Sequence, residues 1–175
     1  KYRIPLYLLM KIYLKYPERI YTREREGLIY IHKFTPKNVE KSCDIVLQNR
    51  EYDLKNIYKR AISLKHIKIE PGSVAIIPNL RVIERTNSNK IYPIYKLMIS
   101  KLIDAKKIVY ILRHSHEDLI VCEKIKIFFP NERNVKLIPD DLNAIELENI
   151  IKQFDFIIAS RYHSVIHAYK NGVPA

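Results

Sequence analysis

Short apolar runs alternate with helical patterns through the last hundred residues of the chain. Apolar segments of strand length lie at 73–77, 107–112, 135–138 and 154–159. Segments with helical spacing of apolar residues follow them at 91–105, 117–129, 144–152 and 162–171. Strands that alternate with helices of this length indicate βαβ units, which right-handed crossovers stack into one sheet. We therefore predict an α/β fold with a Rossmann-like, doubly wound parallel sheet.

The first part of the chain has a looser pattern. We expect helices at 6–16 and 24–33, a short extended piece at 19–21 and a strand at 44–47. From 48 to 70 the sequence becomes polar and mixed, and Pro71-Gly72 then precedes the first clear strand. Residues 50–70 are therefore the predicted linker.

The strand predicted at 154–159 ends abruptly in Ser160-Arg161-Tyr162-His163, and the helix after it stops at Gly172 and Pro174. A cation and an imidazole thus lie at the carboxyl end of a strand. Ligands of open α/β sheets bind just outside such ends, where the start of a helix also supplies N–H donors. The pattern predicts a site for an anion.

The chain contains three glycines, Gly27, Gly72 and Gly172. Neither a G-x-G-x-x-G turn nor a G-x-x-x-x-G-K-[ST] loop can be written with them. This argues against a dinucleotide oxidoreductase and a P-loop nucleotidase. Any phosphate must be held by side chains and helix ends.

The formal charge of +12 raises the question of nucleic-acid binding. Lysines and arginines are spread over nearly every segment and interleaved with acidic residues, which favours a solvated basic surface over a nucleic-acid face. We expect no nucleic-acid partner. A secondary attraction to an anionic polymer or a membrane surface stays open.

Both cysteines, Cys43 and Cys122, adjoin apolar stretches, which predicts two buried thiols in a reducing compartment. No apolar run approaches the roughly 18–20 residues of a membrane span, because Lys11 interrupts the apolar start of the chain. A cytoplasmic location follows. The chain begins with Lys1 and stops directly after a predicted helix, so we expect a fragment of a longer protein.

Several segments together follow the pattern of a known family. The carboxy-terminal segment contains Asp155, Ile157-Ile158, Arg161-Tyr162-His163-Ser164, Ala168 and Gly172-Val173-Pro174. This combination is similar to the carboxy-terminal signature of the polysaccharide pyruvyltransferase family. Earlier segments follow the order of that family: Ile20-Tyr21-Thr22-Arg23-Glu24, Cys43-Asp44-Ile45-Val46, the strand before Arg81, and the stretch from Ile111 to Asp118. The resemblance covers most of the chain.

This resemblance implies two Rossmann-like domains in a GT-B-like architecture. Residues 1–49 are then the end of the first domain, and 71–175 are most of the second. The implied reaction transfers pyruvyl from phosphoenolpyruvate to sugar hydroxyls as a ketal, during synthesis of a cell-surface polysaccharide. The acceptor is a glycan or a lipid-linked saccharide, which allows peripheral association with the inner face of the membrane. No cofactor or metal is expected.

The implied substrate suits the candidate residues. Arg161 can make two parallel hydrogen bonds to the carboxylate or phosphate of phosphoenolpyruvate. His163 can exchange a proton near neutral pH or bind the phosphate, and Ser164 belongs to the same substrate-binding motif. His114, at the end of an earlier predicted strand, is expected to assist with phosphate or with the acceptor hydroxyl. Arg81 could add a second cation.

Structural roles compete with these assignments. Arg161 could pair with Asp155 or with the carboxyl end of a helix, and His163 could cap a helix or pack against it. His114 could be a half-exposed residue at a strand end. Three polar residues fit exposed surface positions: Arg81, His116 and Asp118.

The pair His163 and His167 has the spacing of zinc ligands on one helix. However, Ser164 occupies the position of the glutamate in H-E-x-x-H, so we expect His167 to pack inside the domain.

Two other functions stay open. One is a GT-B glycosyltransferase that uses a nucleotide sugar, although such enzymes usually have a Gly-rich turn where Arg161 and His163 lie. The other is a non-catalytic member of the same fold.

Overall fold

The computed structural model describes residues 4–35, 38–48, 63–86 and 88–175. Contacts between residues divide the chain into two compact units, Lys1–Glu51 and Tyr52–Ala175.

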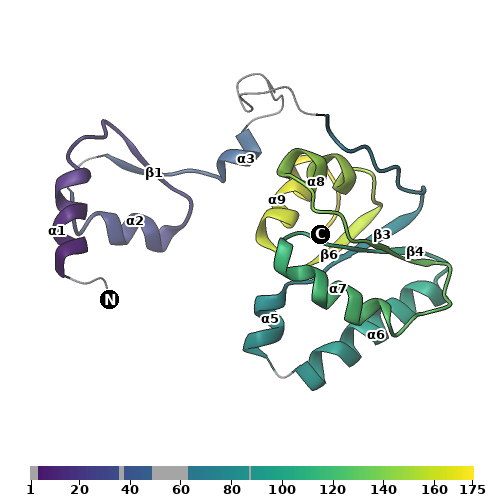
Figure 1. The fold of residues 1–175 in the computed structure, drawn as a ribbon. Coiled ribbons are helices and arrows are strands. Elements are labelled where there is room, and N and C mark those ends of the chain that lie inside the picture. The colour runs from purple at the N-terminus through teal and green to yellow at the C-terminus, as the bar shows by residue number, and fades with distance from the viewer. Residues whose placement is uncertain (1–3, 36–37, 49–62, 87) are drawn as a thin grey trace. The chain divides into compact units, whose positions relative to one another are not determined.

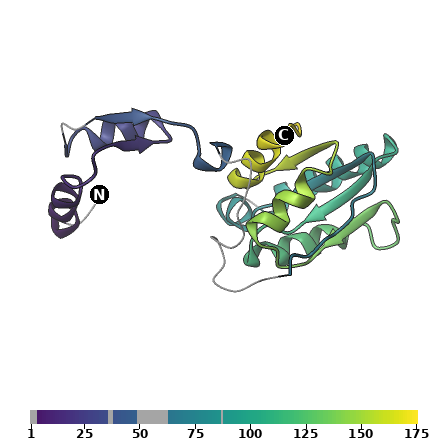
Figure 2. The ribbon, with the colours of Figure 1, turned by 90° about the horizontal axis from the view of Figure 1, so that it is seen from above.

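The first unit contains a small parallel sheet (Figure 1). Its elements are α1 (Ile4–Tyr13), β1 (Ile20–Thr22), α2 (Arg25–Ile31), β2 (Val39–Lys41) and α3 (Ile45–Gln48). The two strands pair in parallel, with Ile20 opposite Val39 and Thr22 opposite Lys41. Figure 2 shows the same strands and α2 from above. The connection through α2 therefore forms a short βαβ unit.

The prediction of a strand at 44–47 is wrong. The strand lies earlier, at Val39–Lys41, and the apolar residues 45–48 form α3. Asp44 explains the difference, because its Oδ1 accepts a hydrogen bond from the Val46 N–H (3.1 Å), as a residue at a helix start does. The side-chain contact overrides the strand tendency of β-branched residues.

The second unit contains the predicted series of strands and helices. Its elements are β3 (Ser73–Ile77), α5 (Leu80–Arg85), α6 (Ser88–Asp104), β4 (Ile108–Leu112), the 3₁₀ turn η1 (His116–Asp118), α7 (Leu119–Lys126), β5 (Val135–Ile138), α8 (Ala144–Ile151), β6 (Phe156–Ala159) and α9 (Tyr162–Lys170). All four predicted strands are confirmed. The pattern missed α5, and the helix predicted from residue 117 begins instead as the turn η1.

The four strands form one parallel sheet in the order β5-β4-β3-β6. The chain moves from β3 outward to β5 and then returns to the other side of β3. Figure 1 shows α8 and α9 on one face of the sheet and α5, α6 and α7 on the other. Because helices cover both faces, every residue of β3 is buried. The predicted α/β class and parallel sheet are confirmed.

Each face of the sheet has its own apolar core. One core joins residues of α8 and α9, such as Ile151 and Ala168, to Ile77 and Leu112. The other joins residues of α6 and α7, such as Ile99 and Ile125, to the opposite side of the strands. The sheet is therefore held at a fixed position between two helical layers, and its strand ends are rigid supports for polar loops.

The segment 63–70 runs along α8. Its main chain donates two long-range hydrogen bonds, from Lys65 N–H to Glu146 Oε1 (2.7 Å) and from Ile69 N–H to Gln153 Oε1 (3.1 Å). Ile69 is buried in the core beneath α8. This part of the sequence thus belongs to the second unit.

The two cysteines differ. Cys122 is fully buried in α7, as predicted, whereas Cys43 is exposed between β2 and α3. The prediction of two buried thiols is therefore wrong for Cys43, because its apolar neighbours lie on an exposed helix. None of the helices in the described residues is long and apolar enough to cross a membrane.

The start of α8 gives a test of this architecture. The Asn143 side chain accepts hydrogen bonds from the N–H groups of Ile145 and Glu146 (both 3.0 Å), and Glu146 Oε2 accepts one from the Asn143 N–H (2.9 Å). We expect Asn143→Ala to lower the free energy of unfolding by about 1 kcal/mol, because two N–H groups lose their partner. Urea unfolding followed by circular dichroism measures this loss. Asn143→Ser, which can still cap the helix, should retain most of the stability, and an equal loss in both variants would contradict the capping role.

Candidate functional site

The candidate site lies at the carboxyl edge of the four-stranded sheet. The register aligns Ile77 at the end of β3 with Ala159 at the end of β6, and Ile76 with Ile111 near the end of β4. The loops that follow these three strands therefore emerge at the same edge. The structure thus places His114, which follows β4, and Arg161, which follows β6, at the same edge of the sheet, as the sequence pattern predicts.

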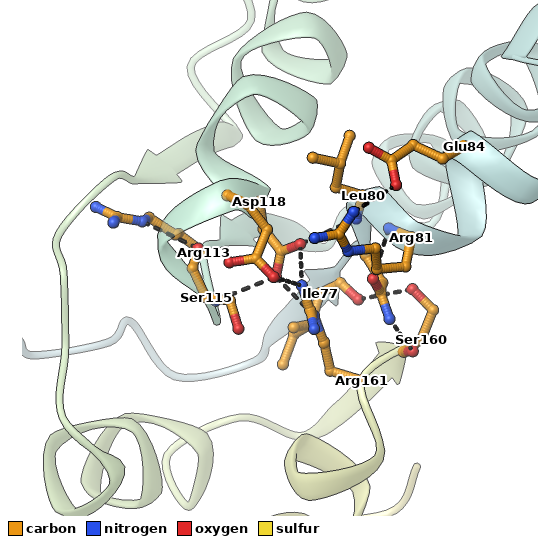
Figure 3. Close-up of polar contacts among 11 residues, drawn as sticks. Ile77, Leu80, Arg81, Glu84, Arg113, Ser115, Asp118, Ser160 and Arg161 are labelled. Carbon is orange, nitrogen blue, oxygen red and sulfur yellow. Dashed lines mark hydrogen bonds and ion pairs between the residues drawn. The ribbon is translucent and has the colours of Figure 1, made fainter. Parts of the chain in front are cut away.

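A buried carboxylate, Asp118, joins these loops (Figure 3). Its side chain is completely inaccessible to solvent. It accepts hydrogen bonds from the N–H groups of Leu80 (2.9 Å) and Ser115 (3.1 Å), and from Nε (2.8 Å) and Nη2 (2.6 Å) of Arg161. Leu80 follows β3, Ser115 follows β4 and Arg161 follows β6. One carboxylate thus connects all three strand ends.

The predicted surface position of Asp118 is wrong. An aspartate close to histidines in the sequence predicts an exposed residue. Asp118 can be buried because an arginine and two main-chain N–H groups surround its carboxylate. The sequence did contain a signal for this role. Ser115 and Asp118 have the S-x-x-D spacing in which an acidic side chain accepts from the N–H at a helix start.

The guanidinium of Arg161 forms ion pairs with two acidic residues. Besides Asp118, its Nη2 contacts Glu117 Oε1 (2.9 Å), and the Arg161 side chain is only 18% exposed. The hydrogen bond to Asp118 is the main cause that raises the pKa of Arg161. The alternative partner Asp155 pairs instead with Lys107 Nζ (2.7 Å). Nη1 of Arg161 has no hydrogen-bond partner among the residues that the structure describes.

His114 lies two residues beyond β4 and is largely buried. Both of its ring nitrogens are buried and lack a hydrogen-bond partner within the described part of the chain. Burial, and after it the positive charge of Arg161, lower the pKa of His114 to about 4. The imidazole is therefore neutral near pH 7, with one donor and one acceptor available.

Arg161 lies directly before α9, and the first turn of α9 contains two further candidate residues, His163 and Ser164. His163 is exposed, and its ring meets that of Tyr162 edge to face at 5.4 Å. The charge of His163 contributes to the lowered pKa of His114, so the two imidazoles lie within electrostatic reach. Ser164 is fully buried, and its Oγ has no partner among the described residues. The roles of His163 and Ser164 in binding or catalysis stay predictions.

The far end of α9 is anchored to α8. Glu148 Oε2 contacts His167 Nδ1 (3.2 Å), and Glu148 Oε1 contacts Lys170 Nζ (3.1 Å). His167 is buried as predicted, and burial lowers its pKa. Across the described ranges, no three His, Cys, Asp or Glu side chains gather as a set of metal ligands. The anchor keeps the start of α9 at a fixed place on the sheet edge.

Arg81 lies at the rim of the same edge. Its Nη1 pairs with Glu84 Oε2 (2.8 Å), which raises the pKa of Arg81, and the side chain is more than half exposed. The sequence reasoning missed its neighbour Asn79. Asn79 Oδ1 accepts from the Arg81 N–H (2.8 Å), and its Nδ2 donates to the Ser160 carbonyl (3.1 Å). This amide links the loops after β3 and β6 in addition to Asp118.

The chain is similar to a known protein family. The family model described as polysaccharide pyruvyl transferase matches residues 3–175. No curated protein matches the chain significantly. No solved structure does so either.

The central role of Asp118 can be tested with its neighbour as control. We expect Asp118→Ala to lower the free energy of unfolding by about 3–5 kcal/mol, because Arg161 and two main-chain N–H groups lose their buried partner. Glu117→Ala removes a partly exposed partner of the same guanidinium and should cost less than about 1 kcal/mol. Chemical denaturation of both variants provides the comparison. Similar losses in the two variants would contradict the structural role of Asp118.

The lowered pKa of His114 predicts a dependence of stability on pH. In the unfolded chain the imidazole titrates near 6.5, whereas the fold holds it neutral down to about 4. Below pH 6.5 the unfolded chain binds a proton at His114, whereas the folded protein does not bind it until the pH reaches about 4. The free energy of unfolding is therefore unaffected by the titration of His114 above pH 6.5 and decreases as the pH falls toward 4. We expect the wild type to lose ~1–2 kcal/mol more than His114→Leu between pH 7.5 and pH 4.5. Equal losses in the two proteins, measured by urea unfolding at both pH values, would rule out a buried neutral imidazole.

Proposed function

Because the chain belongs to the polysaccharide pyruvyl transferase family, we propose that it transfers pyruvyl from phosphoenolpyruvate to two hydroxyls of a saccharide as a ketal. The observation that carries this proposal is the largely buried His114, whose two ring nitrogens lack partners in the described residues and lie near Arg161. Buried polar atoms without partners are costly and mark places where a substrate can supply the missing hydrogen bonds.

The reaction needs anion binding and proton exchange. A proton is added to C3 of phosphoenolpyruvate while a first sugar oxygen attacks C2. Phosphate then leaves C2 and a second sugar oxygen takes its place. The two hydroxyl protons balance the proton added to C3 and the proton taken up by the departing phosphate. The methyl group, the ketal and inorganic phosphate account for all atoms. The protein must therefore hold a carboxylate and a phosphate and move protons between oxygen and carbon.

Arg161 suits the binding of the carboxylate and phosphate because its guanidinium has a fixed orientation, although acidic residues compensate most of its positive charge. Asp118 and Glu117 compensate its charge and hold Nε and Nη2, which leaves Nη1 for the substrate. The N–H groups in the first turn of α9 and the exposed Arg81 provide further positive potential at this edge. A donor carboxylate or phosphate at the start of α9 would contact these groups together.

The histidines suit the second task. His114 is neutral near pH 7 and can both donate to a substrate oxygen and accept a hydroxyl proton. His163 follows Arg161 by two residues at the exposed start of α9, where an imidazole can exchange protons with solvent and substrate. We assign proton exchange to His163 and substrate binding to Arg161, His114, Ser164 and Arg81.

The wider setting follows from the family. We propose that the two units belong to a GT-B-like enzyme of cell-surface polysaccharide synthesis, with a glycan or lipid-linked saccharide as acceptor. Such an enzyme would act in the cytoplasm, at the inner face of the membrane when its acceptor is lipid-linked.

Phosphoenolpyruvate binding and transfer can be measured separately. We expect phosphoenolpyruvate to raise the melting temperature of the protein, and UDP or GDP to leave it unchanged, because a ligand stabilises only the state that it binds. In transfer assays, His163→Ala should lower kcat/KM by about 10²–10⁴-fold. Arg161→Lys keeps a charge for Asp118 but loses the paired hydrogen bonds to that carboxylate and the Nη1 donor left for the substrate, and should lower kcat/KM by about 10²-fold or more.

His66→Ala provides a matched control, since His66 is an exposed histidine of the same unit on the segment beside α8. Its activity should equal that of the wild type. Full activity of both His163→Ala and Arg161→Lys would overturn the site assignment. Stabilisation by a nucleotide and not by phosphoenolpyruvate would overturn the proposed reaction in favour of a glycosyltransferase.

A further inference from the structure

The first unit has a hollow at the carboxyl end of its own two strands. It lies where β1 ends at Thr22 and where the chain leaves β2 after Lys41, and its volume is about 820 Å³. Its lining residues are Tyr21, Thr22, Arg23, Glu24, Gly27, Ser42, Cys43, Asp44, Ile45 and Gln48. All of them belong to the first unit. The volume falls in the range of small-molecule binding sites.

Thr22 lines this hollow, and its hydroxyl group lacks a hydrogen-bond partner among the described residues. Thr22 is only 7% exposed, and its Oγ1 is buried without a hydrogen bond to any described residue. The main chain is fixed at this point, because the Thr22 carbonyl accepts a hydrogen bond from the Ser42 N–H (2.9 Å). A buried hydroxyl in a fixed position without a partner costs stability, and a ligand that bonds to it removes this cost.

The charges in the hollow do not favour an anion. Arg23 is the one cation among the lining residues, and it pairs with Asp44 (3.0 Å) and with Glu24 (3.0 Å). Two carboxylates therefore face one guanidinium. A phosphate or carboxylate ligand would meet excess negative charge here, in contrast to a ligand that carries only hydroxyl groups.

The other polar groups suit hydroxyls. Gln48 Nε2 donates to Ser42 Oγ (3.0 Å), so an amide and a second hydroxyl lie side by side. Carboxylates accept from sugar hydroxyls, and guanidinium and amide groups donate to them. The exposed ring of Tyr21 adds an apolar surface, and Gly27 contributes no side chain to the wall.

We propose that this hollow is a binding site for a neutral saccharide, with the Thr22 hydroxyl as a direct ligand. The inference rests on the proposed function in one respect, namely that the bound saccharide is the acceptor of the pyruvyl group.

Cys43 makes the site measurable without catalysis. It is exposed and lines the hollow, whereas Cys122 is fully buried and its thiol pKa is raised to about 12. Because the thiolate is the reactive form, iodoacetamide at neutral pH should label Cys43 alone in the folded protein. A ligand in the hollow would slow this labelling.

The experiment measures the rate of Cys43 alkylation in the full chain, with methyl glycosides of common hexoses and N-acetylhexosamines as probes. We expect at least one saccharide to slow labelling in a saturable manner, and inorganic phosphate and phosphoenolpyruvate to have no effect. Thr22→Val keeps the side-chain shape and should weaken the protecting saccharide by about three- to tenfold, because one hydrogen bond is lost. Its melting temperature should stay the same or rise, since the removed hydroxyl had no partner. Thr86→Val, at an exposed threonine of the second unit, should leave protection unchanged.

Two results would overturn the inference: protection by no saccharide, or protection by phosphoenolpyruvate instead. Transfer assays separate it from the proposed function. Thr22→Val should raise the KM for the saccharide by about three- to tenfold and leave the KM for phosphoenolpyruvate unchanged. Saccharide protection that depends on Thr22 without any transfer would leave this site standing and refute the reaction. Transfer with an unchanged saccharide KM in Thr22→Val would refute this site and leave the reaction standing.

Discussion

The buried carboxylate of Asp118 is the constraint on which the sheet edge depends. An ionised group without solvent access must have nearly all its hydrogen bonds made, and Asp118 takes them from the loops after β3, β4 and β6. A shift of any one loop would leave a charge unpaired inside the protein. The three strand ends are therefore held in one arrangement before any substrate arrives, which is what a binding site of defined geometry requires.

This constraint also determines what Arg161 can offer. Asp118 and Glu117 hold its guanidinium in one orientation and compensate most of its positive charge. Arg161 can therefore offer a hydrogen-bond donor in a fixed direction. Burial, and after it the positive charge of Arg161, disfavours protonation of His114, which keeps its imidazole neutral near pH 7. The proposed reaction needs both anion binding and proton exchange.

The two units present chemically different edges. The edge of the second unit combines a guanidinium with imidazoles, and the hollow of the first unit combines hydroxyl, amide and carboxylate groups around a paired arginine. Both edges lie at the carboxyl ends of parallel strands, because that is where the chain turns from strand to helix and polar side chains need not pack in a core. The proposals for donor and acceptor binding follow this difference in charge.

Local sequence patterns suffice to predict the four strands of the main sheet, most of its helices, the family, and the place of Arg161 at a strand end. These features depend on local periodicity and motif spacing, which act over a few residues. Tertiary structure decided the burial of Asp118, the pairing of Arg161 and the position of β2. A carboxylate can be buried only where groups distant in sequence meet around it, and a three-residue strand with one buried apolar residue, Val39, exists only because β1 lies beside it.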